Sequence, residues 1–256
     1  MAGEVNHIQA YWRPRAESAK NCAIRLISML DGLAEAHFAF AHWNRQACSR
    51  AAANLQAWRM PPNIGELTTV FEDGRQFKDV PRIPWPELGY WISAWNGLDP
   101  PYGTSLMVCA GGYTDSRPFP NTVDLKVNRA GPDNKDLTNG GVLKSALLAV
   151  ATAWDPDYAV VVPWDYWSRS FGDRGYPNLR SGWMTYLAPK YANQIKPPPA
   201  AIVEPVPGDG MLLLATEEQF SMDSPAHLAV ADAIQKALDP LQDMVPPGRD
   251  DQPRAR

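Results

Sequence analysis

The sequence predicts an α+β fold in which an antiparallel β-sheet of about six to eight short strands is packed by three to five helices. Short runs with two-residue apolar alternation lie between turn-forming residues, as in antiparallel strands. Longer segments repeat apolar residues at three- and four-residue steps, as in helices that lie on a sheet. Strands and helices do not alternate regularly, which disfavours a parallel βαβ fold. Because a central helix divides two strand groups, two fused half-sheets remain the alternative.

The N-terminal part of the chain is expected to form one strand and three helices. Residues His7–Arg13 alternate as a short strand that ends at a proline. Residues 16–37 carry the clearest helical periodicity of the chain. Asn44 is interpreted as the N-cap of a second helix that runs through Trp58. A third, short helix is expected over Ile64–Glu72.

The middle of the chain predicts an antiparallel meander that follows an extended, proline-rich segment at residues 81–86. Its three strands are expected at Gly89–Asn96, Ser105–Gly111 and Thr122–Asn128, each bounded by Gly, Pro, Asn or Asp. Apolar and polar residues alternate strictly in the last strand. One of its faces is therefore expected to contact water, as is common in antiparallel sheets.

The C-terminal part is expected to hold two helices and four further strands. Asn139 or Thr138 is expected to cap a helix that ends at Trp154, and Ser224-Pro225 is a helix start. The strands are expected at Tyr158–Val162, Trp183–Ala188, Ala200–Val206 and Met211–Thr216. Residues 243–256 contain almost no apolar side chains and should form a disordered tail. A single domain is therefore expected over residues 1–242.

The overall composition excludes several functional classes. The formal net charge is −4 and Lys and Arg form no run, which disfavours a nucleic-acid-binding protein. No segment has the order of charges and apolar residues of a signal peptide, and none has 18 uninterrupted apolar residues, so no membrane association is expected. Cys22, Cys48 and Cys109 have no metal-site or disulfide spacing. We therefore expect a cytoplasmic protein.

No residue pattern supports catalysis, a metal site or a cofactor. The four histidines lack any metal-binding spacing, and no nucleophile elbow or phosphate-binding loop occurs. Cys109 lies in a predicted strand with no basic neighbour that would lower the pKa of its thiol. The aspartates between residues 155 and 173 lie among turn formers, where an aspartate usually shapes a loop. The expected function is thus binding; an unrecognised hydrolase is the weaker alternative.

The segment from Trp154 to Tyr191 carries the strongest binding signal, because aromatic and acidic residues interleave in it. Tryptophan and tyrosine dominate the energetics of protein interfaces, and charges steer and select the partner. Two further loops repeat this combination. The candidate partner-binding residues are Asp155, Asp157, Trp164, Asp165, Tyr166, Trp167 and Asp173, with Asp99 and Tyr102 in a second loop and Asp115 in a third. Most tryptophans of such a chain belong to the core, and we assign Trp91 or Trp95, Trp154 and Trp183 there.

Three motifs resemble the bacterial immunity protein 52 family. They are the opening Tyr11-Trp-Arg-Pro-Arg15, the strand Gly89-Tyr-Trp-Ile-Ser-Ala-Trp-Asn-Gly97, and Gly182-Trp-Met-Thr-Tyr-Leu187. Together with the long first helix, the resemblance spans roughly residues 10 to 236. It implies a cytoplasmic antidote to a secreted polymorphic toxin, often a type VI secretion effector with a nuclease-type domain. It transfers no catalytic and no toxin-contacting residue to this sequence.

The resemblance implies a non-enzymatic protein that covers the active region of a toxin. A nuclease-type toxin binds phosphates with Lys and Arg, so that acidic loops would compete for the same surface. The partner is thus expected to be a cognate toxin, with no nucleic acid or membrane involved. An adaptor or chaperone that loads an effector into a secretion system is the alternative, because it would also be acidic and non-enzymatic.

Overall fold

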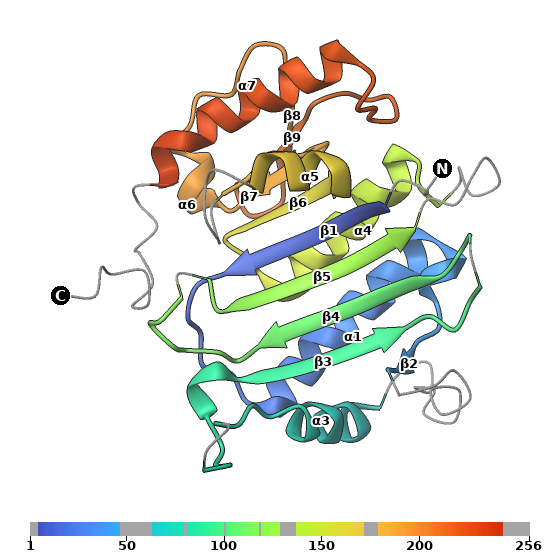
Figure 1. Cartoon of the computed structure of the whole chain (residues 1–256), viewed down its shortest axis with the longest axis vertical. Coiled ribbons are helices and arrows are strands. Elements are labelled where there is room, and N and C mark those ends of the chain that lie inside the picture. Colours follow the sequence, from blue (N-terminus) through green and yellow to red (C-terminus); the bar gives the residue numbers. More distant parts are fainter. Residues whose placement is uncertain are drawn as a thin grey trace.

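The computed structural model describes residues 5–46, 63–78, 81–99, 101–117, 119–128, 137–171 and 179–242 (Figure 1). One sheet of nine antiparallel strands has the order β2-β3-β4-β5-β1-β6-β7-β9-β8. The strands are β1 (Val5–Trp12), β2 (Asn44–Arg45), β3 (Tyr90–Trp95), β4 (Thr104–Ala110), β5 (Asn121–Asn128), β6 (Tyr158–Pro163), β7 (Met184–Leu187), β8 (Ile202–Val206) and β9 (Gly210–Leu214). This confirms the predicted α+β class and the single antiparallel sheet, and excludes the alternative of two separate half-sheets among the described residues. The number of strands is slightly higher than expected.

Six described helices accompany the sheet, and most follow the predicted ranges closely. They are α1 (Ala19–Ala36), α3 (Ile64–Asp73), α4 (Gly140–Trp154), α5 (Trp164–Phe171), α6 (Pro189–Ala192) and α7 (Pro225–Gln242), with short 3-10 turns η1 (Phe38–Phe40) and η2 (Pro86–Leu88). Asn139 caps α4, and its side chain accepts a hydrogen bond from the Val142 backbone N–H. Within the described residues, no helix has the length and apolar character required to span a membrane.

The first strand, β1, lies in the middle of the sheet and joins its two halves. It pairs with β5 on one side and with β6 on the other, so that Ala10 stands opposite both Val123 and Ala159. Every residue from Asn6 to Trp12 is buried. The meander β3-β4-β5 and the C-terminal strands therefore form one continuous sheet only because β1 inserts between them.

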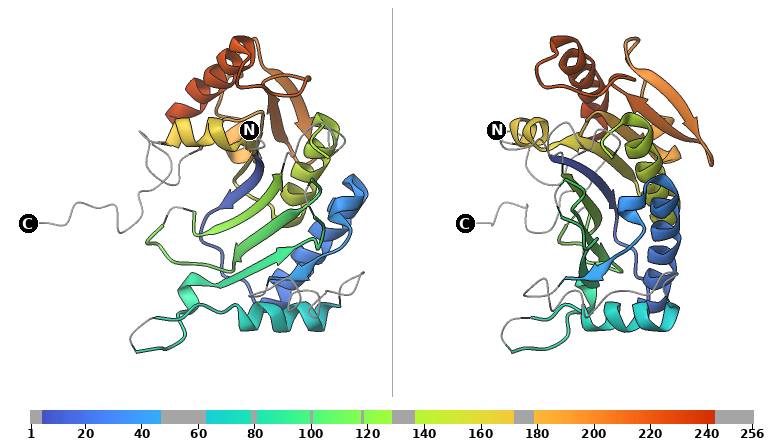
Figure 2. Two further views of the ribbon diagram at one scale, coloured as in Figure 1. Left: turned by 45° about the vertical axis from the view of Figure 1, so that its right-hand side comes forward. Right: turned by 90° about the vertical axis from the view of Figure 1, so that its right-hand side faces the viewer.

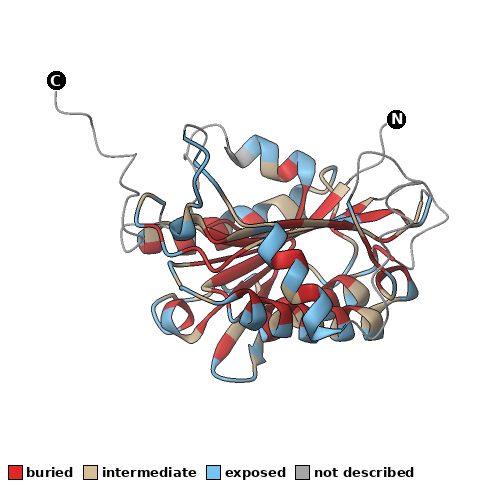
Figure 3. Ribbon diagram, turned by 90° about the horizontal axis from the view of Figure 1, so that it is seen from below, coloured by how far each residue is buried: buried red, intermediate tan, exposed pale blue. Residues whose placement is uncertain are grey.

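Helices α1 and α4 cover one face of the sheet, and α5 lies against the other (Figure 2). Trp12 of β1 stacks on Trp154 of α4, with 5.3 Å between the ring centroids. His7, which points to the opposite face of the same strand, contacts Trp164 of α5. Buried residues concentrate in the sheet and on the sides of the helices that face it (Figure 3). Among the described residues, no helix covers β3, β4 and part of β5 on the face that carries α5, and Trp91 of β3 is 53% exposed there (Figure 2). This part of the sheet is called the open face.

The predicted helix from Asn44 to Trp58 is wrong at its start, because Asn44 and Arg45 form β2. Asn44 pairs with Trp95 of β3, and the Gln46 backbone N–H donates to the Ser93 carbonyl at 3.0 Å. Without this pairing, the outer edge of β3 would expose unpaired backbone groups. Pairing with β3 therefore decides the conformation of Asn44, although asparagine is a residue type that favours the N-cap of a helix. The remainder of that prediction, and the predicted tail at residues 243–256, lie outside the described residues.

A second difference concerns Trp164–Phe171, which sequence analysis interpreted as a loop and which forms helix α5. Trp164 and Trp167 stack on one another at helical spacing, and Tyr166 is buried. The eight-residue length and the alternation of aromatic and polar residues hide this helix from a periodicity search. Among the predicted core tryptophans, Trp154 and Trp183 are buried, whereas Trp91 is 53% exposed and Trp95 is half-buried.

We predict that Gly32→Ala destabilises the protein by about 1–2 kcal/mol, although alanine is the better helix former. A Cβ atom at Gly32 of α1 would lie 2.8 Å from the Cβ of Ala149 of α4, so the two helices would have to separate. Urea unfolding followed by circular dichroism measures the effect. The control is Thr152→Ala, at an exposed site of α4, which should change stability by only a few tenths of a kcal/mol. An unchanged or raised stability for Gly32→Ala would contradict the close packing.

Candidate functional site

The candidate residues gather at two opposite ends of the sheet. Asp155 and Asp157 connect α4 to β6 beside the C-terminal end of β1, where the Asp157 backbone N–H donates to the Tyr11 carbonyl. Trp164, Asp165, Tyr166 and Trp167 follow β6 at its other end, beside the N-terminal end of β1. The strand β6 separates the two groups, so they do not form the single surface that their nearness in sequence suggests. Asp173 lies outside the described residues.

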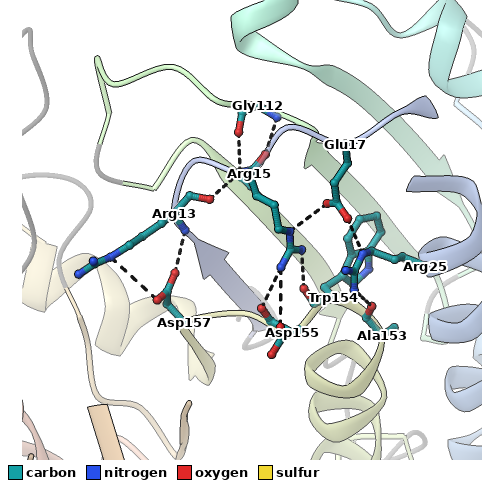
Figure 4. A network of polar contacts seen from close by, with 10 residues as sticks. Arg13, Arg15, Glu17, Arg25, Gly112, Ala153, Trp154, Asp155 and Asp157 are labelled. Atoms are coloured by element: carbon teal, nitrogen blue, oxygen red, sulfur yellow. Dashed lines mark hydrogen bonds and ion pairs between the residues drawn. The ribbon is translucent and has the colours of Figure 1, made fainter. Parts of the chain in front are cut away.

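At the first end, two arginines hold the C-terminus of α4 (Figure 4). Arg15 donates to the Trp154 carbonyl at 2.7 Å, and Arg25 donates to the Ala153 carbonyl at 2.8 Å. Glu17 accepts hydrogen bonds from both guanidinium groups, and its side chain is only 8% exposed. Cationic groups at the last carbonyls of a helix satisfy them and complement the helix dipole. This network therefore fastens α1 and the end of β1 to α4.

The two predicted aspartates at this end belong to the same network. Asp157 accepts a hydrogen bond from the Arg13 backbone N–H at 2.8 Å and is largely buried. Asp155 takes the left-handed conformation (φ 48°) that ends α4, and its side chain is 78% exposed. The turn-former interpretation of these aspartates therefore has structural support. Asp115, in the β4–β5 connection at the same end of the sheet, is exposed.

At the second end, helix α5 presents two stacked tryptophan rings. The Trp164 and Trp167 centroids lie 4.9 Å apart with an interplanar angle of 19°. Trp164 also lies 5.3 Å from the ring of His7, whose Nδ1 is 2.8 Å from Asp124 Oδ1. Trp164 is 45% exposed, and Asp165 beside it is exposed too. Stacking holds the rings in one arrangement, so a partner that packs on them has little side-chain entropy to remove.

Tyr166 belongs to the core rather than to this surface, because it is only 2% exposed. Its hydroxyl donates to Asp232 Oδ1 at 3.0 Å and lies 3.1 Å from Ser181 Oγ. Burial is the main cause that raises the pKa of Tyr166 to about 12, so the phenol stays protonated at neutral pH. Tyr166 therefore links α5 to α7 through its hydrogen bond to Asp232.

The β3–β4 loop brings the second predicted pair, Asp99 and Tyr102, to the same end of the sheet as α5. Asp99 is exposed. Tyr102 stacks on His37 at 6.1 Å and contacts Phe38 at 5.0 Å between ring centroids. Phe38, which sequence analysis did not select, is among the most exposed large apolar side chains of the described residues. It contacts His37 beside it in the sequence and Tyr102 from a distant loop, and the second contact cannot be read from a local pattern.

The open sheet face supplies further surface that sequence analysis missed. Pairing places Trp91, Cys109 and Thr122 in one row across β3, β4 and β5. Tyr11 of β1 stands opposite Thr122, so this row lies on the face that carries His7 and α5. Trp91 is more than half exposed there. An exposed tryptophan on a sheet face offers apolar contact area to a partner.

Neither a cluster of metal ligands nor an activated cysteine is found among the described residues. No group of three or more His, Cys, Asp or Glu in that part of the chain has a metal-binding arrangement. Burial raises the pKa of the Cys109 thiol to about 11 and that of Cys22 to about 12. Both thiols are therefore protonated at neutral pH, whereas a nucleophilic cysteine needs a lowered pKa.

Comparisons with known proteins give a family and a fold. The family model described as Immunity protein 52 matches residues 4–244. Among solved structures, the Pseudomonas aeruginosa T6SS protein PA0821 is similar, with a TM-score of 0.52, 11% sequence identity, and coverage of 92% of this chain and 74% of that chain. At this identity the likeness concerns the fold alone. None of the curated proteins matches the sequence.

The arginine network predicts different outcomes for two acidic residues. Glu17→Ala should lower the free energy of unfolding by about 3 kcal/mol, because it leaves Arg15 and Arg25 without their shared, buried carboxylate. Asp155→Gly removes only an exposed ion pair, and glycine suits the left-handed backbone, so stability should stay within about 0.5 kcal/mol or rise. Chemical denaturation at neutral pH measures both. Equal effects of the two changes would contradict this assignment.

Proposed function

The chain belongs to the immunity protein 52 family, and we propose that it binds one cognate bacterial toxin and covers its active region. We further propose that the toxin is a type VI effector of the nuclease type and that the two proteins meet in the cytoplasm. The family points to a role without catalysis. The likeness in fold to a T6SS protein of Pseudomonas aeruginosa supports the secretion context of the proposal.

The stacked Trp164–Trp167 pair with exposed Asp165 is the observation that carries this proposal. An immunity protein must hold its toxin with slow release, which requires buried aromatic anchors within an interface of about 1,200–2,000 Å². The two rings supply such anchors on a helix that lies against the sheet. Asp165 supplies a carboxylate that competes for the cationic, phosphate-binding surface of a nuclease and speeds association.

A loading adaptor of a secretion system is the second candidate. It would use the same kind of surface, because it too must bind an effector protein without acting on it. The two functions differ in their effect on the toxin: an immunity protein abolishes toxicity, whereas an adaptor binds the effector and leaves it toxic.

The test begins with a search for a toxin gene adjacent to this gene and continues with co-expression of the two proteins. The wild-type protein should rescue growth, and Trp164→Ala combined with Asp165→Lys should lose protection and weaken binding about 100-fold or more, as is usual when a hot spot is lost. Growth with and without toxin induction and binding calorimetry measure the two effects. Thermal unfolding should show a small loss of stability, about 1 kcal/mol, because Trp164 gives up its stacking on Trp167 and His7, whereas Asp165 is exposed. The variant should therefore remain folded at the temperature of the assay.

The matched control replaces an exposed apolar and an exposed acidic residue on the covered side of the sheet. Ile24→Ser combined with Asp31→Lys on α1 should protect as well as the wild type. If the α5 double variant still binds and protects, the contact lies elsewhere. Binding by the wild type without rescue would favour the adaptor.

A further inference from the structure

A small two-stranded arm projects from the sheet between α3 and β3. It comprises residues 75–78 and 81–88. The Lys78 backbone N–H donates to the Ile83 carbonyl at 2.9 Å, and the Trp85 backbone N–H donates to the Gln76 carbonyl at 2.8 Å. At its base, Arg75 pairs with Tyr90 of β3. A two-stranded hairpin alone is only marginally stable in water, so an arm of this kind gains from packing against another surface.

The arm exposes apolar and cationic side chains together. Phe77 is 38% exposed and Ile83 is 45% exposed. The Lys78 ammonium lies 5.3 Å from the centre of the Trp85 ring, and the Arg82 guanidinium lies 4.9 Å from that of Phe77. Each cation thus lies over a ring instead of beside a carboxylate, and such contacts at exposed sites contribute only about 0.5–1 kcal/mol. The arm therefore presents apolar contact area with positive charge on it.

Further exposed rings surround the base of the arm. Trp91 and Tyr113, like Phe77 and Ile83, rank among the exposed large apolar side chains of the described residues. A cavity of about 240 Å³ lies at the same corner, with a lining that includes Arg75, Pro86, Tyr90 and Tyr113. Glu17 also lines this cavity, and its carboxylate already accepts hydrogen bonds from Arg15 and Arg25. A cavity beside exposed apolar side chains suits the insertion of an anchoring side chain from a partner.

The arm projects on the side of the sheet that carries α5, away from α1 and α4 (Figure 2). The α5 surface and the arm therefore flank the open sheet face. The two tryptophans of α5 bury at most about 150–250 Å² each, whereas a stable complex buries about 800 Å² per partner. The α5 surface is thus too small by itself, and a partner that reaches across the open face would meet the arm.

We propose that the arm, with the cavity at its base, is a second docking surface for the cognate toxin and takes an apolar segment of the toxin that carries carboxylates. This inference rests on the proposed function. Lys78 and Arg82 on the arm lie over aromatic rings, whereas Arg75 at its base is already paired with Glu72. The positive charge of Lys78 and Arg82 stands out in a chain that carries −4 as a whole, so electrostatic complementarity selects an acidic partner region. A nucleic acid is a poorer fit, because the cations alternate with prolines and exposed apolar residues and form no continuous basic stripe.

The toxin therefore meets surfaces of opposite charge at the two borders of the open face. Asp165 on α5 faces the cationic part of the toxin, and the arm receives its acidic part. Such an arrangement fixes the orientation of the complex, because a reversed toxin would set like charges against each other at both borders.

The test uses the full-length protein and the toxin encoded beside its gene. Hydrogen exchange should slow over residues 75–88 when the toxin is added. Phe77→Ser with Ile83→Ser should weaken binding at least tenfold, mainly through faster dissociation. Lys78→Glu with Arg82→Glu should slow association and weaken its dependence on salt. The matched controls on α1 are Ile24→Ser, which is also 45% exposed, and Lys20→Glu.

The possible results distinguish a failure of the arm as a docking surface from a failure of the proposed function. Slowed exchange and weaker binding by the arm variants, with unchanged controls and unchanged thermal unfolding, support the inference. Arm variants that bind within twofold of the controls, or unchanged exchange over residues 75–88, overturn the arm while leaving the immunity function intact. Failure of the wild-type protein to bind the toxin at all overturns the proposed function together with the arm.

Discussion

The pairing of β1 on both of its edges is the interaction on which the rest of the structure depends. It joins the meander to the C-terminal strands, and its alternating side chains divide the molecule into a covered and an open face. Trp12 packs under α4, whereas His7 supports Trp164 of α5. The arginines that follow β1 then fasten α1 and the end of α4. The first strand of the chain therefore positions both the core and the candidate binding surface.

Tryptophan residues contribute both to the core and to the exposed surface of this protein. Trp12, Trp154 and Trp183 lie within the core, and each is almost wholly removed from water. Trp91 and Trp164 lie on the open face and keep about half of their surface in contact with solvent. The exposed part of each ring remains available for contact with a partner. The covered face, by contrast, is occupied by the protein's own helices.

Acidic residues also fall into two groups: some are partly or wholly buried and hold the fold together, and others are exposed and can contact a partner. Glu17 is bonded to two arginines and Asp157 to the backbone of Arg13, and both hold secondary-structure elements together, whereas Asp165 stays exposed beside stacked rings. Carboxylates that are bonded in this way cannot steer a partner, because their charge is already compensated. Burial likewise keeps the thiols of Cys22 and Cys109 protonated at neutral pH, because it raises the pKa of both.

Local patterns were sufficient to predict the α+β class, the long helices α1 and α4 and the meander strands, because periodicity is a local property. They narrowed the cap of α4 to Asn139 or Thr138, and the structure shows that it is Asn139. Contacts between distant elements place Asn44 in a strand and Trp164–Phe171 in a helix, and they bury Tyr166 while Trp91 stays exposed. The tertiary structure also decided that Asp155 and Asp157 lie at the opposite end of the sheet from Asp165. These outcomes depend on contacts between residues that are far apart in the sequence, and no local pattern records which side chain a distant strand or arginine will meet.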